Sequence, residues 1–275
     1  MSIEIARSDG QMEHTQIEEP MLEKVKDLKG FKLEAIDGHI GTLAEFYFDD
    51  RHWTVRYLVA DTGSWLSERQ VLISPLAVAS VNRDDRTISV NQTRKQIEDG
   101  PAPEAHKPIS RQFEDSYHDY YGFPFYWGGT FAVGAYLNVV QAHRQVDRIH
   151  KEGESWDYHL RSTKDVTGYV LQAKDGDIGH VDDFILEDVS WTIRYLIVDT
   201  RNWWPGRHVL VSPAWIDRID WVDGKVTVLM TREAVRESPE YTETSLLTRD
   251  YETKVHEHYD RPGYWGEDPT GVNHK

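Results

Sequence analysis

Short apolar runs, separated by turn residues at close spacing, make up most of the chain, a pattern typical of an all-β sandwich or barrel. Residues 53–62 read WTVRYLVADT and residues 191–200 read WTIRYLIVDT, so every difference exchanges one aliphatic residue for another. β-branched and aromatic residues dominate both runs and place apolar side chains on both faces of a strand. Such a strand needs cover on both sides, as inside a small closed barrel or between packed layers.

The two runs belong to a longer internal repeat, with an offset of 138 positions from Trp53 to Trp191. The same offset aligns the turns Asp37-Gly38 and Asp175-Gly176, the segments 71–75 and 209–213, and the dipeptides Thr93-Arg94 and Thr231-Arg232. The alignment needs no gap. It indicates a tandem duplication of a unit of roughly 100 residues, an ordinary size for one domain.

Each repeat is predicted to end in a helix and an aromatic segment. Phe113 and Tyr117 fall on one face of a helix over about residues 110–121, and Tyr251 and Val255 do so in the second repeat. The segments that follow, residues 121–127 and 259–265, are called the aromatic codas. The predicted division of the chain is a flexible tail (1–25), a first barrel unit (26–128), a connector (129–160), a second barrel unit (161–266) and a C-terminal tail (267–275).

Net charge and composition limit the kinds of partner the protein can bind and indicate its cellular compartment. The net charge of −16 repels phosphate backbones and anionic lipid heads, so we expect neither nucleic-acid binding nor direct membrane binding. The chain has no cysteine, which excludes thiolate catalysis and fits a cytoplasmic location. Residues 120–142 are uncharged but include Gly122, Pro124 and Gly128, and we interpret them as an aromatic connector packed on protein.

An ordered series of motifs occurs twice, over residues 30–75 and 168–213: G-x-x-(apolar)-x-A-x-D-G-x-I-G, then W-T-(V/I)-R-Y-L-(V/I)-x-D-T, then V-L-(I/V)-S-P. This series resembles the PRC-barrel domain, a small β-barrel of the cytoplasmic part of the photosynthetic reaction-centre H subunit and of RimM-type ribosome maturation factors. The expected fold class is therefore mainly β, with two tandem PRC-barrel-like units, each followed by a helix. The resemblance implies a module for protein–protein contact that has no catalytic residues of its own.

Three functions follow from the residues and the resemblance. The expected one is a non-catalytic bacterial interaction or assembly module, without a cofactor, whose protein partner is unknown. The second is a photosynthesis-associated or membrane-peripheral role like that of the H subunit, although that subunit carries a membrane helix and none is expected here. The third is a small-molecule or metal-binding enzyme, which would need a concave pocket lined by convergent polar groups. A homodimer is plausible on general grounds.

Four charged residues stand in otherwise apolar strands: Arg56 and Asp61 in the first repeat, and Arg194 and Asp199 in the second. Positions five apart on a strand point to opposite faces, so neither pair can form within its own strand. We interpret each Asp as an acceptor of turn hydrogen bonds and each Arg as a bridge to a neighbouring strand. The alternative is a functional anion site at the arginine.

The remaining motifs give no evidence of catalysis or metal binding. His256 and His258 lie about 200° apart on a helix, so they cannot chelate one ion together. His118 and His256 recur between the repeats beside the apolar face of a helix, where packing is the expected role. The acidic pairs Asp49-Asp50 and Asp182-Asp183 are interpreted as solvated turn residues. No G-x-S-x-G, Walker A or G-x-G-x-x-G sequence occurs.

Ten tryptophans are many for this length, and most lie in turns, late strands or codas. Aromatic side chains in such places are favoured where two folded surfaces bury each other. The candidate interaction surface comprises Trp65, Tyr126, Trp127, Trp203, Trp204, Tyr264 and Trp265. We predict that the codas at Tyr126-Trp127 and Tyr264-Trp265 pack on the opposite barrel and create a pseudo-twofold pair.

Overall fold

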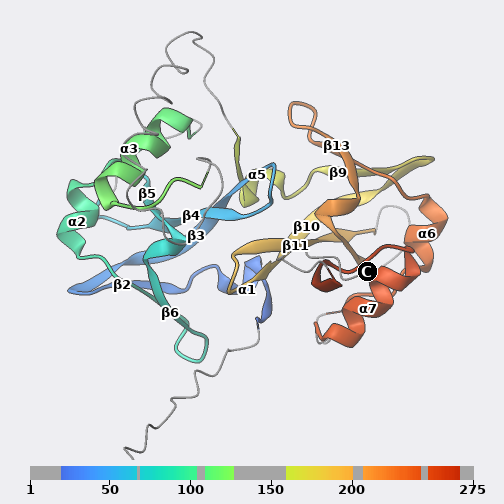
Figure 1. Cartoon of the computed structure of the whole chain (residues 1–275), viewed down its shortest axis with the longest axis horizontal. Coiled ribbons are helices and arrows are strands. Elements are labelled where there is room, and N and C mark those ends of the chain that lie inside the picture. Colours follow the sequence, from blue (N-terminus) through green and yellow to red (C-terminus); the bar gives the residue numbers. More distant parts are fainter. Residues whose placement is uncertain are drawn as a thin grey trace, which may run out of the picture.

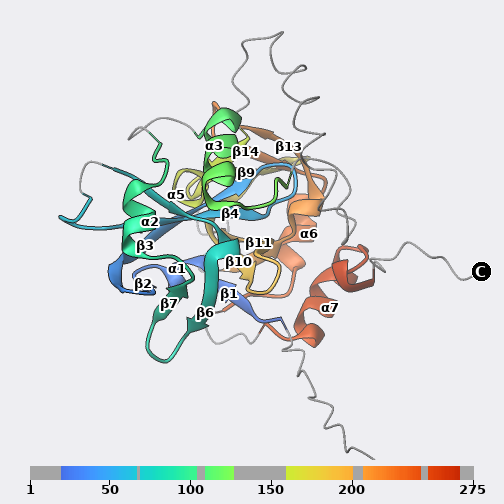
Figure 2. The same ribbon diagram turned by 60° about the vertical axis from the view of Figure 1, so that its left-hand side comes forward.

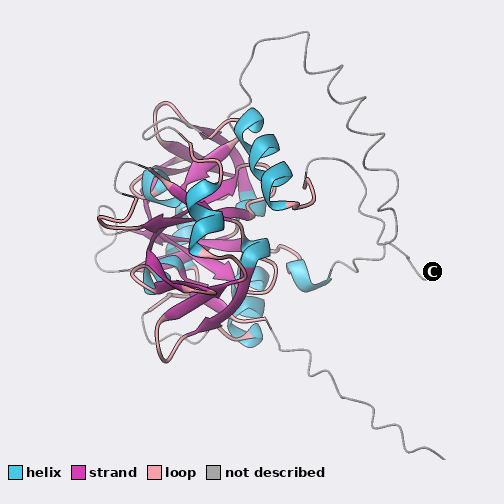
Figure 3. Ribbon diagram, turned by 90° about the vertical axis from the view of Figure 1, so that its left-hand side faces the viewer, coloured by secondary structure: helices cyan, strands magenta, loops and turns pink. Residues whose placement is uncertain are grey.

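A computed structural model of the chain describes residues 20–66, 69–103, 109–126, 159–200, 207–242 and 247–266. Two β-rich units lie side by side, one for each sequence repeat (Figure 1). Coloured by secondary structure, the described part of the chain has more strand than helix, and its helices are short (Figure 3).

The first repeat forms its elements where the turn residues predict them. They are β1 (Leu22–Lys24), α1 (Val25–Leu28), β2 (Lys32–Ala35), β3 (Gly38–Asp49), β4 (Val55–Asp61), β5 (Val71–Ile73), the 3₁₀ turn η1 (Pro75–Ala77), β6 (Val78–Asn82), β7 (Thr87–Val90), α2 (Arg94–Asp99) and α3 (Arg111–Tyr121). α2 begins at a capping box, in which the Thr93 hydroxyl accepts the Gln96 N–H and the Gln96 side chain accepts the Thr93 N–H. Ser110 caps α3, and Gly122, with φ of 67°, ends it.

The second repeat reproduces this order. Its elements are β8 (Leu160–Ser162), α5 (Thr163–Val166), β9 (Val170–Ala173), β10 (Gly176–Glu187), β11 (Thr192–Asp199), β12 (His208–Val211), η3 (Pro213–Trp215), β13 (Ile216–Asp220), β14 (Lys225–Val228), α6 (Arg232–Glu237), α7 (Arg249–His258) and η4 (Tyr264–Gly266). The longest strands, β3 and β10, begin 138 positions apart, the offset of the sequence repeat. The predicted mainly β fold of two duplicated units with C-terminal helices is confirmed.

Each unit is built on one seven-stranded sheet. The first sheet has the order β5-β4-β3-β2-β7-β6 with β8 also on β3, and the second has the order β12-β11-β10-β9-β14-β13 with β1 also on β10. Neighbouring strands are antiparallel except the parallel pairs β2 with β7 and β9 with β14. In the described residues, β5 does not pair with β6, nor β12 with β13, so neither sheet closes into a complete hydrogen-bonded barrel.

The central strand β4 is covered on both faces, as its sequence predicts. Leu58 and Ala60 point into the main cluster of buried apolar side chains, which runs through both units. Tyr57 and Val59 point to the other face, into a smaller cluster that also holds Tyr117 of α3. A strand with apolar side chains on both faces therefore has protein on both sides.

The first strand and first helix of each repeat lie on the other repeat's sheet (Figures 1 and 2). β1 pairs antiparallel with β10, Leu22 opposite Glu187, and β8 pairs antiparallel with β3, Leu160 opposite Asp49. The helices follow their strands, since Asp183 of β10 accepts the Lys26 N–H of α1 at 3.2 Å and Thr163 Oγ1 of α5 accepts the Phe46 N–H of β3 at 3.2 Å. We call this arrangement the reciprocal exchange. It makes each sheet incomplete without the other repeat.

A second contact between the units is a two-residue seam at the repeated tryptophans. Trp53 and Trp191 both take positive φ, 56° and 54°. Their carbonyls accept the N–H of the other unit, Ile193 N–H to Trp53 O and Val55 N–H to Trp191 O, both at 2.7 Å. Phe48 stacks on the Trp53 ring, with ring centroids 5.0 Å apart. The seam and the reciprocal exchange obey the same pseudo-twofold relation between the repeats.

The reciprocal exchange also moves two predicted boundaries. The N-terminal tail was expected to reach residue 25, but Leu22–Lys24 form β1. The connector was expected to reach residue 160, but His159 is buried and Leu160 begins β8. Among the helices described, none is long and apolar enough to cross a membrane.

Candidate functional site

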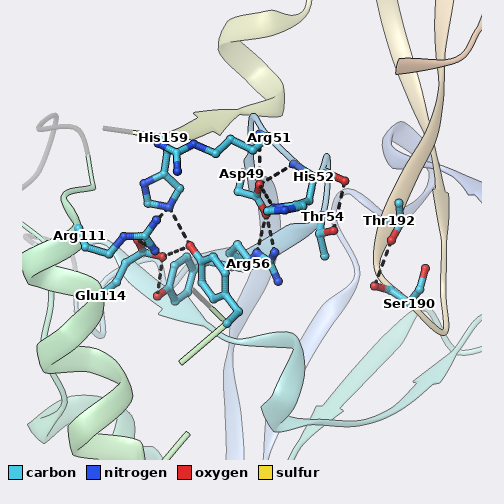
Figure 4. A network of polar contacts seen from close by, with 12 residues as sticks. Asp49, Arg51, His52, Thr54, Arg56, Arg111, Glu114, His159, Ser190 and Thr192 are labelled. Carbon is cyan, nitrogen blue, oxygen red and sulfur yellow. Dashed lines mark hydrogen bonds and ion pairs between the residues drawn. The ribbon is translucent and has the colours of Figure 1, made fainter. Parts of the chain in front are cut away.

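A buried polar cluster of the first unit surrounds Glu114, a fully buried residue of α3 (Figure 4). Its carboxylate accepts the hydroxyls of Tyr57, at 3.4 Å, and Tyr126, at 2.5 Å. Arg111 Nη1 and His159 Nε2 lie 3.2 and 3.1 Å from the second oxygen. We call these five residues the tyrosine cluster. It contains no solvent-exposed member, and its charged groups lie within ion-pair distance of Glu114.

The second unit has the same cluster with one difference. Glu252 of α7 accepts the hydroxyls of Tyr195, at 3.0 Å, and Tyr264, at 2.8 Å, and Arg249 Nη1 lies 2.9 Å from its other oxygen. Burial raises the pKa of Glu252, and Arg249 offsets part of that effect. The counterpart of His159 is Met21, which is exposed, so a histidine at that position contacts the glutamate and the coda tyrosine in the first unit alone; in the second unit His256 Nε2 lies 2.9 Å from the Tyr195 hydroxyl.

The histidines that recur between the repeats pack against aromatic rings. His118 stacks on Phe125, with centroids 5.6 Å apart, and His256 contacts Trp215 at 5.0 Å. Each Nδ1 donates to a backbone carbonyl of the coda that follows, Pro124 or Pro262, both at 2.9 Å. Burial lowers the pKa of both rings, which keeps them neutral at pH 7.

Tyr126 and Tyr264 of the two aromatic codas lie on their own units. Arg56 of β4 covers the Tyr126 ring at 3.7 Å, and Arg194 of β11 covers the Tyr264 ring at 4.1 Å. The prediction that the codas pack on the opposite barrel is therefore wrong for the two tyrosines. The cause is local, because each tyrosine is held between an arginine and a glutamate of the same repeat. The pseudo-twofold pairing arises from the reciprocal exchange and the tryptophan seam.

Arg56 and Arg194 each bridge to the neighbouring strand. Arg56 donates from Nε to Asp49 of β3 at 2.8 Å, and Arg194 Nη2 binds Glu187 of β10 at 2.7 Å. Burial alone would raise the pKa of Asp49, but Arg56 and the His52 N–H hold it below its ordinary value. The charge of Arg56 is therefore balanced by a carboxylate of its own unit.

The interpretation of the acidic pairs as solvated turn residues is wrong for two of the four side chains. Asp49 is 1% exposed and Asp183 is 2% exposed. Both are covered by the exchanged elements, Asp49 by β8 and Asp183 by α1. Burial raises the pKa of Asp183 to about 6, because the backbone N–H groups of Phe184 and Lys26 offset only part of the effect of burial.

The strand-end aspartates differ between the units. Asp61 is exposed and accepts the Gly63 N–H at 3.0 Å, as a turn residue does. Asp199 is fully buried, with His180 Nε2 at 3.8 Å and His208 Nε2 at 4.0 Å from one carboxylate oxygen. Ligands of one tetrahedral ion with bonds of about 2.1 Å lie roughly 3.4 Å apart, so these separations are too long. No group of three or more His, Cys, Asp or Glu among the described residues is arranged to hold a metal ion.

A surface pocket of about 410 Å³ opens where the β2–β3 hairpin meets the start of α2. Its polar and aromatic lining comprises His39, Thr42, Asp61, Thr62, Trp65 and Arg94. The Arg94 guanidinium lies over the Trp65 ring, 4.5 Å from the centroid. Trp65, a predicted interaction residue that the structure describes, therefore lines this pocket.

The second unit has a pocket of about 680 Å³ at the equivalent place, between β9, β10 and the start of α6. Arg232 lines it in the position of Arg94, and Asp177 and His180 stand where the first pocket has His39 and Thr42. Trp203, the counterpart of Trp65, lies outside the described residues, as do Trp204 and Trp127. We call the two the arginine pockets.

Sequence reasoning missed the tyrosine cluster and the arginine pockets. Glu114 and Arg111 look like solvent-facing charges of an amphipathic helix, yet both are buried. The offset of 138 positions carried the signal, because it aligns Glu114 with Glu252 and Arg111 with Arg249. No such signal existed for His159, whose role depends on the place of β8.

Part of the chain matches a known family. Residues 22–97, from β1 into α2, match the family model of the PRC-barrel domain. No curated protein matches the chain. The matched elements are the ones that the second unit repeats as a second sheet.

Proposed function

The chain carries a PRC-barrel domain at residues 22–97 and a second unit with the same order of elements, and from this we propose that it acts as a non-catalytic assembly module. The module presents its two units, at a fixed spacing, to protein partners. Each unit offers an equivalent outer surface that includes an arginine pocket.

The reciprocal exchange is the observation that carries the proposal. Because β1 and α1 complete the second sheet while β8 and α5 complete the first, neither unit can rotate without breaking strand pairs in both. Two binding surfaces held at a fixed distance raise the effective concentration of the second contact to the millimolar range. That gain is useful to an assembly module and has no evident use in a single active site.

The chemistry inside the units supports the same proposal. Glu114, Tyr57 and Tyr117 are almost fully buried, and their polar groups are bound to other parts of the same unit. The two arginine pockets lie elsewhere, and neither is lined by a member of the tyrosine cluster. A catalytic site needs a reactive group that substrate can reach. The buried carboxylates instead fix the C-terminal helices on the sheets.

The test is affinity capture with the full chain as bait from lysate of the native source, followed by purification of the captured protein. A bait with Trp65→Ala is the matched control, because it alters one pocket wall and leaves the strands intact. Native mass spectrometry of the purified pair then gives the stoichiometry. We expect two partner sites for each chain, and weaker capture by the control bait.

Two results would contradict the proposal. One is a captured protein that binds a single site per chain with the same strength in the Trp65→Ala variant. The other is the absence of any protein enriched over an unrelated acidic bait. Either result would mean that the fixed spacing of the two units does not serve the binding of protein partners.

A further inference from the structure

The contacts that hold the two units together do not require the units to belong to one polypeptide. β1 and α1, which we call the first arm, lie on β10, and β8 and α5, the second arm, lie on β3. Two ion pairs also join the repeats, Arg83 with Asp188 at 2.6 Å and Arg161 with Asp50 at 2.9 Å. In each of these contacts, a residue of the first repeat meets a residue of the second. A second copy of the chain can therefore supply either side.

The segment that links the units is much longer than the distance between its ends. Residues 127–158, 32 positions, separate Tyr126 of the first unit from His159, which precedes the second arm. The Tyr126 hydroxyl nevertheless lies 2.8 Å from His159 Nε2. A chain of that length reaches up to about 110 Å. The linking segment is therefore long enough for each unit to pair with a unit of another chain.

The arms favour the pairing of a first unit with a second unit over the pairing of two first units. On β10, Asp182 binds Lys26 of the first arm at 2.8 Å, and the equivalent position of β3 is Ala44, which has no charge. On the first unit, His159 Nε2 lies 3.1 Å from the Glu114 carboxylate, and the first arm has methionine at the equivalent position. Two first units would lose both contacts. A pair between two copies should therefore join unlike units.

We propose that the chain binds a second copy of itself by exchanging units, so that the second arm of each copy completes the first sheet of the other. Each copy supplies one first and one second unit, and the resulting dimer is closed and leaves no arm unpaired. The single chain and the dimer make the same contacts, so concentration decides between them. Linked units meet at an effective concentration on the order of 1 mM, and the dimer becomes populated as the protein approaches that concentration. The dimer holds four units in two rigid pairs, which goes beyond the proposed function of the single chain.

Disulfide trapping tests the exchange, because the full chain has no cysteine of its own. Thr54 and Thr192 are β-bridge partners across the seam, and such partners lie at a spacing that a disulfide can bridge. One copy carries Thr54→Cys and the other Thr192→Cys, and an equal mixture is unfolded in urea and refolded at a total concentration of about 1 mM. A disulfide between the two copies then reports a first unit paired with the second unit of another chain. The chain with both substitutions, refolded in dilute solution, should form the bond within itself and so shows that the substitutions permit folding.

We expect the Thr54→Cys copy to link to the Thr192→Cys copy about tenfold more than to itself, because two first units lose two polar contacts. The yield should rise with protein concentration, and the linked product should elute as a compact species of two chains on size-exclusion chromatography. Ser80→Cys, at an exposed position of β6, replaces Thr54→Cys in the control for random collision. Equal linking in that control, equal linking of like copies, or unlinked chains at the highest concentration would overturn the proposal. The experiment contains no other protein, so its failure is distinct from a failure to capture a partner.

Discussion

Removal of the Tyr126 hydroxyl isolates the contribution of the tyrosine cluster to stability. Tyr126→Phe keeps the ring under Arg56 and deletes two polar contacts, to Glu114 Oε1 at 2.5 Å and to His159 Nε2 at 2.8 Å. The change therefore alters hydrogen bonding without opening a cavity. It also removes the contact that joins the first coda to the residue before β8.

The structure sets the size of the effect. A hydrogen bond to a charged group contributes about 1.5–3 kcal/mol, and the lower end applies because Glu114 keeps Tyr57 and Arg111. His159 loses one partner in the same change, at a cost of about 1 kcal/mol. We expect Tyr126→Phe to lower the free energy of unfolding by about 2–3 kcal/mol. For a domain pair of this size, that corresponds to a fall in Tm of about 4–10 °C.

Tyr264→Phe is the matched control in the second unit. It deletes the hydrogen bond to Glu252 at 2.8 Å, and the histidine of that cluster, His256, contacts the Tyr195 hydroxyl and not that of Tyr264. The expected loss is about 1.5 kcal/mol, the lower end of the range for a hydrogen bond to a charged group. Urea denaturation of both variants, monitored by circular dichroism, measures the two free energies of unfolding. Amide hydrogen exchange of β8 and α5 adds a local measurement, which should be faster in Tyr126→Phe alone.

Equal losses in the two variants would refute this reasoning, because the His159 contact would then contribute nothing. A Tyr126→Phe variant with an unchanged free energy of unfolding would refute the role of the whole tyrosine cluster. The buried Glu114 would have to be satisfied without the hydroxyl, and the cluster would not anchor the coda.

Two other substitutions test the fold. Gly41→Ala places a Cβ 2.2 Å from the Asp61 carbonyl oxygen at φ of 143°, and it should lower the free energy of unfolding, measured by calorimetry, by about 3 kcal/mol or more. Gly63→Ala is the control, because the space around Gly63 is open, and it should cost about 1 kcal/mol. Equal losses in the two variants would contradict the close approach of Gly41 to Asp61. Asp183→Asn removes a carboxyl whose pKa burial raises to about 6, so ionisation of Asp183 should destabilise the wild-type protein increasingly from about pH 4 to pH 6, by up to about 3 kcal/mol. The stability of Asp183→Asn relative to wild type should therefore rise across this range in urea titrations and then level off, and a difference that does not vary with pH would contradict the burial of a charge there.

The sequence predicts the elements of this fold well because their signals are local. Thr93 and Gln96 specify the start of α2, and Asp37-Gly38 specifies the β2–β3 turn, whichever unit surrounds them. The apolar residues on both faces of β4 require cover from two sides, and the structure supplies it. The internal repeat then extends each local prediction to the second unit.

The reciprocal exchange could not be predicted from the sequence, and the repeat itself is the reason. β1 and β8 are equivalent positions of two similar units, so either strand can complete either sheet. Each has only three residues, too few for an apolar pattern to choose between the sheets. The burial of Asp49 and of Asp183 depends on this choice, which explains why both were taken for solvated residues.

The candidate site was predicted in part. Trp65 lines an arginine pocket, and Arg56 bridges between strands, but the codas pack locally because Glu114 and Glu252 bind their tyrosines. A glutamate on an amphipathic helix gives no sequence signal of burial. The Arg94 guanidinium lies over the ring of Trp65, and the sequence gives no signal of this contact because the two residues belong to separate segments.

The most direct test of the interlocked pair is to cut the chain between the units. A recognition sequence for a site-specific protease, inserted after Gly153, lets the intact folded protein be cleaved into two fragments. Each fragment carries a strand and a helix that complete the sheet of the other, so we expect the cleaved protein to elute as one species on size-exclusion chromatography and to separate in denaturant. Separation of the two fragments under native conditions would contradict the reciprocal exchange.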